Sequence, residues 1–139
     1  MCGIAGYLGP DTPALLQKML DSIKHRGPDD TGVYYDGSLG LGIKRLAIVD
    51  PKKWRQPIFN EDKSMCVVFN GEIYNFTLLR EELESLGHRF LTDTDTEVIL
   101  HAYEAWGTEC LQRFNGMFAF AIWNHNTNQL FIARDRLGI

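Results

Sequence analysis

The sequence predicts an α+β fold in which antiparallel sheets are layered with helices. Strand-like segments occur early, in the middle and late in the chain, and helical segments lie between them. Two pairs of strand-like segments are joined by short polar turns, as in hairpins. In a doubly wound parallel sheet, strands and helices would alternate more regularly, so that alternative is disfavoured.

The first half of the chain begins with a short apolar run, residues 3–8, that predicts a strand. Thr12 and Pro13 are typical of a helix start. The helix that follows has one apolar face, formed by Leu15, Leu16, Met19, Leu20 and Ile23. After a turn-rich stretch over 25–32, residues 33–36 and 39–43 flank a polar turn and predict a hairpin. Residues 46–49 extend the expected strand content.

The second half begins with an apolar run over 65–69, typical of a buried strand, and we expect it to stop at Asn70-Gly71. Helices are predicted over 75–86 and 96–106, because apolar residues recur at helical spacing and a glycine follows each segment. A helical turn is expected over 108–114. A second hairpin is expected from residues 117–123 and 129–133, joined by a polar turn.

Length and composition indicate one soluble globular domain over residues 1–139. The chain is 45% hydrophobic and 23% charged, and its net charge of -4 offers no basic surface for nucleic acid. Neither a signal peptide nor a membrane-spanning run is recognisable, so we expect a cytoplasmic protein without a membrane partner. The three cysteines are far apart, which favours reduced thiols and no metal site.

Cys2 is the sharpest candidate for chemistry. Removal of Met1 would place a thiol and a free α-amine on the same residue, and an N-terminal amine can activate a side-chain nucleophile. Their reference pKa values, about 8.5 and about 7.7 to 8.0, suit that pairing. The alternative is that Cys2 only opens a buried strand, since cysteine is often buried.

Asn70-Gly71 has two interpretations. Between strands, Asn-Gly is a strong signal for a tight hairpin turn. However, the residues that follow run into a helix, so we expect the pair at a strand end where the backbone changes direction. There the Asn70 amide and the Gly71 N–H could converge on one oxygen and form an oxyanion hole.

Arg45 and Asp95 could bind the two charged ends of an amino acid. Arg45 follows an apolar strand and could bind a carboxylate at two points, or it could be a solvated residue beside Lys44. Asp95 could bind an α-ammonium group. Alternatively, it belongs to a capping box in which Thr94 is the N-cap and Glu97 lies three residues on. His25 lies in a polar turn and is not assigned as a base.

Several motifs, taken in order, resemble one family. They are Met1-Cys2-Gly3-Ile4-Ala5-Gly6, Arg26-Gly27-Pro28-Asp29-Asp30, Arg45-Leu46-Ala47-Ile48-Val49-Asp50, Phe69-Asn70-Gly71-Glu72-Ile73-Tyr74-Asn75 and Asp95-Thr96-Glu97-Val98-Ile99-Leu100, with further matches at 115–120 and 133–139. Together they resemble the class II glutamine amidotransferase domain of glutamine-hydrolysing asparagine synthetases. No single motif is that specific, but the ordered set covers essentially the whole chain.

The resemblance implies an N-terminal nucleophile hydrolase fold, a four-layer αββα sandwich of two antiparallel sheets. It implies hydrolysis of L-glutamine through a thioester on Cys2, with an oxyanion hole from Asn70 and Gly71. It further implies that Arg45 binds the α-carboxylate and Asp95 the α-ammonium group, while Glu72 and the backbone near Ile48 line the pocket. Many members have His at or beside position 43, where this chain has Ile43 and Lys44.

Family members continue past Leu-Gly-Ile with more strands and an ATP-using synthetase domain, so we expect a C-terminally truncated fragment. ATP and Mg are expected only for that missing domain, and this chain needs no cofactor of its own. Its expected partners are L-glutamine and the synthetase domain, which amidates aspartate. Three alternatives remain: a non-catalytic glutamine-binding or regulatory domain, an amidotransferase domain that serves a different ammonia acceptor, and a structural domain that retains Met1.

Overall fold

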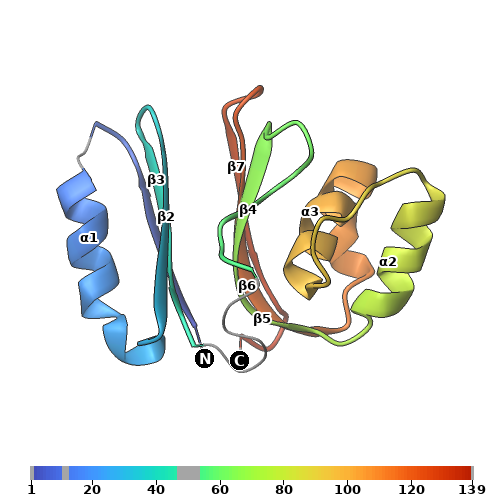
Figure 1. Cartoon of the computed structure of the whole chain (residues 1–139), viewed down its shortest axis with the longest axis horizontal. Coiled ribbons are helices and arrows are strands. Elements are labelled where there is room, and N and C mark those ends of the chain that lie inside the picture. The colour runs from blue at the N-terminus through green and yellow to red at the C-terminus, as the bar shows by residue number, and fades with distance from the viewer. Residues whose placement is uncertain (1, 11–12, 47–53, 139) are drawn as a thin grey trace. The chain divides into compact units, whose positions relative to one another are not determined.

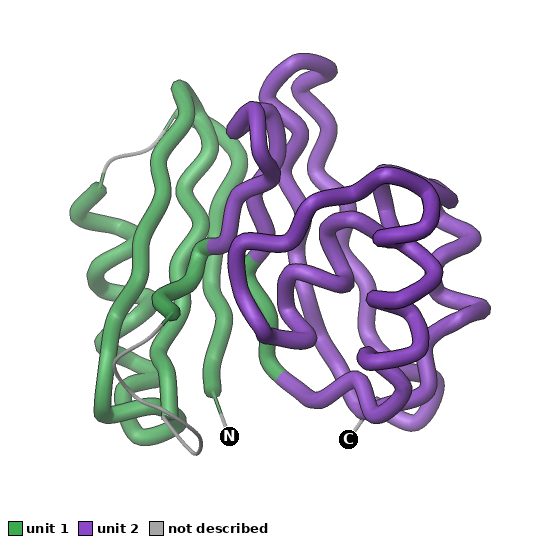
Figure 2. The backbone as a smooth tube through the Cα atoms, turned by 45° about the vertical axis from the view of Figure 1, so that its right-hand side comes forward, with its two compact units in different colours: residues 1–57, 68–70 green, residues 58–67, 71–139 purple. Residues whose placement is uncertain are grey.

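The structure, a computed structural model, describes residues 2–10, 13–46 and 54–138 (Figure 1). The backbone forms two compact units, and Figure 2 shows them in different colours. The first unit comprises Met1–Pro57 and Val68–Asn70, and the second comprises Ile58–Val67 and Gly71–Ile139. The prediction that 1–139 forms a single domain stays a prediction.

The first unit is a three-stranded antiparallel sheet with a helix on one face (Figure 1). The sheet has the order β1-β3-β2, with β1 at Gly3–Leu8, β2 at Asp30–Asp36 and β3 at Leu39–Arg45. The helix α1, Pro13–Ser22, buries Leu16 and Leu20. Gly42 lets it approach, since a Cβ there would lie 2.7 Å from a Leu20 methyl group. A short 3-10 helix, Lys24–Arg26, follows α1.

These elements confirm the expected first strand, helix and hairpin, with one change in extent. The strand β2 begins at Asp30, inside the stretch expected to be turns, because β3 pairs with it from Asp30 opposite Arg45 to Asp36 opposite Leu39. Leu46 lies just outside β3, so it does not extend the strand. The rest of the expected strand, residues 47–49, lies outside the described residues.

The second unit is a four-stranded sheet with helices on one face (Figure 1). The order is β4-β5-β6-β7, with β4 at Ile58–Phe59, β5 at Met65–Ile73, β6 at Gly116–Asn124 and β7 at Gln129–Arg134. The helices are α2, Phe76–Ser85, and α3, Asp95–Trp106, followed by a 3-10 helix at Gly107–Gln112. Among the described helices, none combines the length and apolar character that a membrane crossing requires.

The ends of α2 and α3 confirm the sequence signals. Gly87 and Gly107 have positive φ angles of 98° and 57°, which glycine adopts at little steric cost. The hairpin of β6 and β7 also forms as expected, with Phe120 opposite Ala133. The two-residue strand β4 was not predicted, because so short a segment carries no periodicity.

The strand β5 runs past the point where we expected it to stop. Asn70 and Gly71 lie inside β5, which ends at Ile73, so both the hairpin turn and the expected change of direction at this pair are wrong. Gly71 has φ of +150°, and a Cβ there would collide with the carbonyl oxygen of Met117 on β6. A Cβ at Gly116 on β6 would likewise collide with the carbonyl oxygen of Glu72. Glycine is therefore needed here for the close approach of two strands.

Candidate functional site

Cys2 lies directly before β1 and is only partly buried. Its Sγ atom lies 3.4 Å from the Leu46 nitrogen, whose N–H donates to the sulfur, and 3.9 Å from the Leu46 oxygen. The carbonyl of Cys2 accepts a hydrogen bond from Nε of Arg26 at 3.1 Å. Sequence reasoning had assigned the Arg26 segment only as a turn, although that motif contributed to the family resemblance. The cysteine thus has fixed backbone contacts and an exposed fraction that a core cysteine would lack.

Arg45 lies at the same end of the first sheet as Cys2. Gly3 on β1 pairs with Lys44 on β3. Cys2 precedes Gly3 and Arg45 follows Lys44, so both lie where these two strands meet at one end of the sheet. Arg45 is half-buried, and its Nη1 donates to the carbonyl of Trp54 at 2.7 Å. One corner of the guanidinium is therefore fixed, which contradicts the alternative of a freely solvated side chain. Lys44 is buried, and its Nζ lies 2.7 Å from Thr31 Oγ1.

Asn70, Gly71 and Glu72 are consecutive on β5. Asn70 is half-buried, whereas Gly71 and Glu72 are exposed. Just before them, the N–H of Phe69 donates to Oε1 of Gln56 at 2.6 Å, which holds β5 at this point. The role of Asn70 and Gly71 as an oxyanion hole stays a prediction, as does the place of Glu72 in a substrate pocket.

Asp95 is the first residue of α3, and its Oδ2 accepts the N–H of Ile73 at 3.0 Å. Burial raises the pKa of this carboxyl, the Ile73 hydrogen bond opposes that rise, and the nearby charge of Glu72 adds to it. A half-buried carboxylate that remains partly uncompensated is well suited to a cationic ligand. Its function as an α-ammonium ligand stays a prediction.

The capping-box interpretation of this segment is wrong. Thr94 occupies the N-cap position but makes no side-chain capping bond. Glu97 does not reach back to Thr94; its two carboxylate oxygens accept the N–H groups of Leu91 and Thr92 instead. The loop before α3 therefore folds over the first helical turn, and Glu97 fixes this loop by accepting hydrogen bonds from its backbone.

Each unit contributes some of the predicted site residues. The first contains Cys2, Arg45 and Asn70, and the second contains Gly71, Glu72 and Asp95. Ile48, the remaining pocket residue, lies outside the described residues. His25 is exposed in the 3-10 helix after α1.

Comparison with known families decides what kind of domain this is. The family model of the glutamine amidotransferase domain matches residues 1–139, the whole chain. The chain belongs to this family. The resemblance found in the ordered motifs, from Met1-Cys2-Gly3 onward, is thereby confirmed.

Curated relatives of this glutamine amidotransferase domain are glutamine-hydrolysing asparagine synthetases. Asparagine synthetase 1 of Bacillus subtilis (strain 168) is 44% identical over 146 residues, which cover 100% of this chain and 23% of that protein. Asparagine synthetase 1 of Arabidopsis thaliana is 41% identical over 144 residues, covering 100% of this chain and 24% of that protein. The chain thus spans about a quarter of the length of these relatives.

A solved structure confirms the fold of the domain. The glutamine phosphoribosylpyrophosphate amidotransferase of B. subtilis, complexed with ADP and GMP, matches with a TM-score of 0.80 at 22% identity. The match covers 99% of this chain and 38% of that one. The α+β class with two antiparallel sheets, predicted from the sequence, agrees with this amidotransferase fold.

Proposed function

We propose that this chain hydrolyses L-glutamine to L-glutamate and ammonia, with Cys2 as the nucleophile after removal of Met1. The whole chain matches the glutamine amidotransferase family. One observation in the structure carries the proposal: the Cys2 thiol is partly exposed and contacts Leu46, the neighbour of Arg45 in the chain. A nucleophile and a guanidinium at one end of one sheet suit a substrate with a carboxylate at one end and an amide at the other.

The first half of the proposed reaction forms a thioester. The α-amine of Cys2 takes the thiol proton, and the sulfur attacks the side-chain amide carbon of glutamine. The resulting oxyanion accepts hydrogen bonds from the Asn70 side chain and the Gly71 N–H; loss of one such donor typically costs about 2.7 to 4 kcal/mol. The C–N bond then breaks, and the α-ammonium returns its proton to the leaving ammonia.

The second half releases glutamate. A water molecule attacks the thioester carbon while the α-amine accepts one of its protons. The carbon–sulfur bond breaks, the α-ammonium returns its proton to the thiolate, and the new carboxylic acid loses its proton to solvent and leaves as glutamate. The same amine acts as base and acid in turn, which explains why a retained Met1 would block turnover.

Each charged end of glutamine has its own proposed ligand. Arg45 binds the α-carboxylate with the guanidinium edge that Trp54 leaves available, and Asp95 binds the α-ammonium group. Glu72 is proposed to line the substrate pocket. The raised pKa of Asp95 supports this assignment, because a bound cation would offset the cost of burying its charge.

The released ammonia is proposed to serve the ATP-dependent amidation of aspartate. Support comes from the curated relatives, whose names describe glutamine-hydrolysing asparagine synthetases and whose chains are about four times as long as the matched region. ATP and Mg would be needed by that synthetase domain, in the cytoplasm, and not by these residues.

The decisive experiment measures glutamate released from L-glutamine by the purified protein, with the N-terminal mass recorded. We expect turnover by protein that lacks Met1, none from Cys2→Ala, and retained glutamine binding by Cys2→Ala in calorimetry. A full rate in Cys2→Ala would overturn the proposal. Glutamine binding without turnover in the processed parent would instead indicate a non-catalytic glutamine-binding domain.

A further inference from the structure

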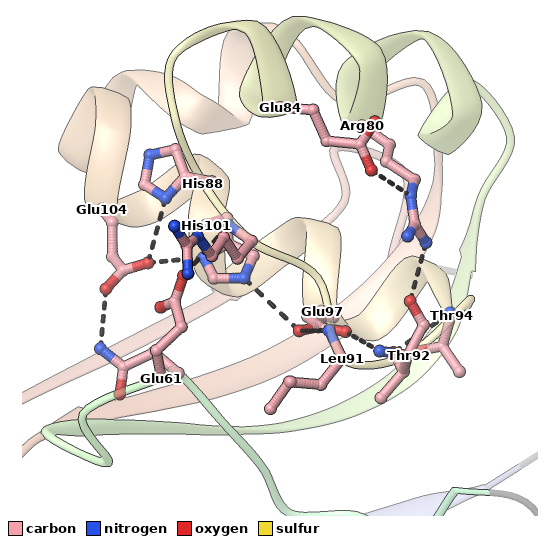
Figure 3. Close-up of polar contacts among 12 residues, drawn as sticks. Glu61, Arg80, Glu84, His88, Leu91, Thr92, Thr94, Glu97, His101 and Glu104 are labelled. Carbon is pink, nitrogen blue, oxygen red and sulfur yellow. Dashed lines mark hydrogen bonds and ion pairs between the residues drawn. The ribbon is translucent and has the colours of Figure 1, made fainter.

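A cluster of imidazole and carboxylate groups lies in the second unit, on and beside α3, and no step of the proposed reaction uses it (Figure 3). At its centre is His101, which has no exposed surface. The Nδ1 atom of His101 lies 2.7 Å from Oε2 of Glu104, one helical turn further on. Its Nε2 atom lies 3.5 Å from Oε1 of Glu97, one turn before.

Two residues from loops complete the cluster. His88, from the loop between α2 and α3, places its Nδ1 3.6 Å from the same Glu104 oxygen. Glu61, from the loop between β4 and β5, is the third contributor (Figure 3). One ligand atom each of Glu61, His88 and His101 lies within 4.8 Å of the others. Three chain segments that are distant in sequence therefore present nitrogen and oxygen donors to one point.

We propose that Glu61, His88, His101 and Glu104 form a structural zinc site. Two imidazoles with carboxylates are a donor set that suits Zn²⁺, whereas Ca²⁺ and Mg²⁺ prefer oxygen ligands alone. In a tetrahedron with bonds of about 2.1 Å, ligand atoms are about 3.4 Å apart. The observed separations of 2.7 and 3.6 Å, and of at most 4.8 Å, lie on both sides of that value.

The groups behind these donors are arranged as in known metal sites. A histidine that binds a metal almost always directs its other ring nitrogen at a carboxylate or carbonyl, which fixes the ring. Here His101 directs Nε2 at Glu97, which is itself buried and held by the N–H groups of Leu91 and Thr92. Glu104 is fixed in turn, because its Oε1 accepts Nδ2 of Asn60 at 2.7 Å.

The charge of the cluster also favours a cation. Three carboxylates, those of Glu61, Glu97 and Glu104, face the two imidazoles. A divalent cation bound between them would offset part of this negative charge.

The site is accessible from one side and would tie loops to the core. Glu61 is exposed, and the side chains of His88 and Glu104 retain 21% and 19% of their exposure, so an ion can enter past them. A bound ion would join the β4–β5 loop and the α2–α3 loop to the middle of α3. Since Asp95 is the first residue of that helix, the ion would also stabilise the element that carries the proposed ammonium ligand.

The test is a titration of tag-free, chelator-treated protein with Zn²⁺ in competition with a chromophoric chelator. The parent for this test carries Cys2→Ala, because an N-terminal thiol and amine bind zinc themselves. We expect one equivalent to bind and to raise the melting temperature. His88→Gln and Glu61→Gln should each weaken zinc binding by at least about 100-fold. That loss is larger than the effect typical of residues that only hydrogen-bond to a metal ligand.

A matched control is His125→Gln, which removes an exposed histidine from the turn between β6 and β7 in the same unit. It should bind zinc as the parent does. Circular dichroism of each metal-free variant checks that the fold is retained. As a second measurement, Co²⁺ should give tetrahedral absorption bands in the parent and control but not in His88→Gln. Absence of saturable binding, or equal binding by His88→Gln and parent, would overturn the proposal.

Discussion

The carboxylate of Asp95 and the backbone N–H of Ile73 form a 3.0 Å hydrogen bond that joins the first residue of α3 to the last residue of β5. This bond orients one carboxylate oxygen through the backbone. The proposed ammonium ligand is thus fixed by the same strand that carries Asn70 and Gly71. Asp95 therefore has a structural role, accepting the Ile73 N–H, and a proposed role in binding the substrate ammonium group. Different substitutions at this position can separate the two.

Asp95→Asn should impair glutamine use while leaving the fold intact. The asparagine carbonyl can still accept the Ile73 N–H, but it cannot pair with an ammonium group as a charge. Hydrogen bonds to charged groups are worth about 1.5 to 3 kcal/mol, so kcat/KM for glutamine should fall about 10- to 150-fold. Asp95→Ala also leaves the Ile73 N–H without its partner and should lower the unfolding free energy by about 1 to 3 kcal/mol. Steady-state kinetics and denaturant titrations distinguish the two variants.

The pH dependence of glutamine binding should report the raised pKa of Asp95. Only the ionised carboxylate attracts the substrate ammonium, so KM should rise as the pH falls through this pKa. The rise should begin at higher pH than for an ordinary aspartate. Glu72→Gln removes a charge that raises the pKa of Asp95 and should shift the inflection to lower pH. An inflection that persists in Asp95→Asn would contradict the assignment.

The contribution of Asp95 to stability has the opposite sign. Because the folded state raises its pKa, folding favours the protonated carboxyl. The stabilising contribution is complete below the unfolded pKa and is lost as the pH rises through the folded one. Acidification should therefore weaken glutamine binding while this residue's own contribution to stability increases. Parallel KM and unfolding measurements on parent and Asp95→Asn would reveal the divergence.

Gly71→Ala should be strongly destabilising. A methyl group there would collide with the Met117 carbonyl, at a backbone angle of +150° that other residues rarely adopt. We expect a loss of more than about 3 kcal/mol of unfolding free energy, from strand separation and backbone strain together. Gly37→Ala is the matched control: its φ is +56° and no atom lies within 4 Å, so it should cost about 1 to 2 kcal/mol. Equal losses in urea unfolding would refute the packing argument.

The helices and hairpins could be predicted because their signals are local. Apolar spacing located α2 and α3, and Gly87 and Gly107 located their ends. The course of β5 could not be predicted in the same way, since Asn70-Gly71 reads locally as a turn. Its extension to Ile73 depends on the approach of β6, a strand more than forty residues later, to which Gly71 and Gly116 are adapted.

The polar contacts around α3 could not be predicted from local sequence patterns alone. The spacing of Glu97, His101 and Glu104 places them on one side of a helix, a signal that the sequence does contain. His88 and Glu61 join them from loops whose course no periodicity describes. Likewise, Thr94 and Glu97 match a capping box by spacing, but the loop at Leu91 and Thr92 takes the carboxylate instead. Sequence spacing establishes which groups can meet, and the loops decide which of them do.

Arg45→Lys should separate planar recognition from charge. The guanidinium can donate to the Trp54 carbonyl and still offer an edge to a carboxylate, whereas one ammonium group cannot do both in fixed geometry. If Arg45 binds the α-carboxylate throughout the reaction, KM for glutamine should rise about 10- to 100-fold with kcat nearly unchanged. Arg55→Lys is the control, because this side chain is 79% exposed and its ion pair with Asp30, at 3.4 Å, is a surface contact. A fall in kcat at constant KM would place Arg45 in the chemical step instead.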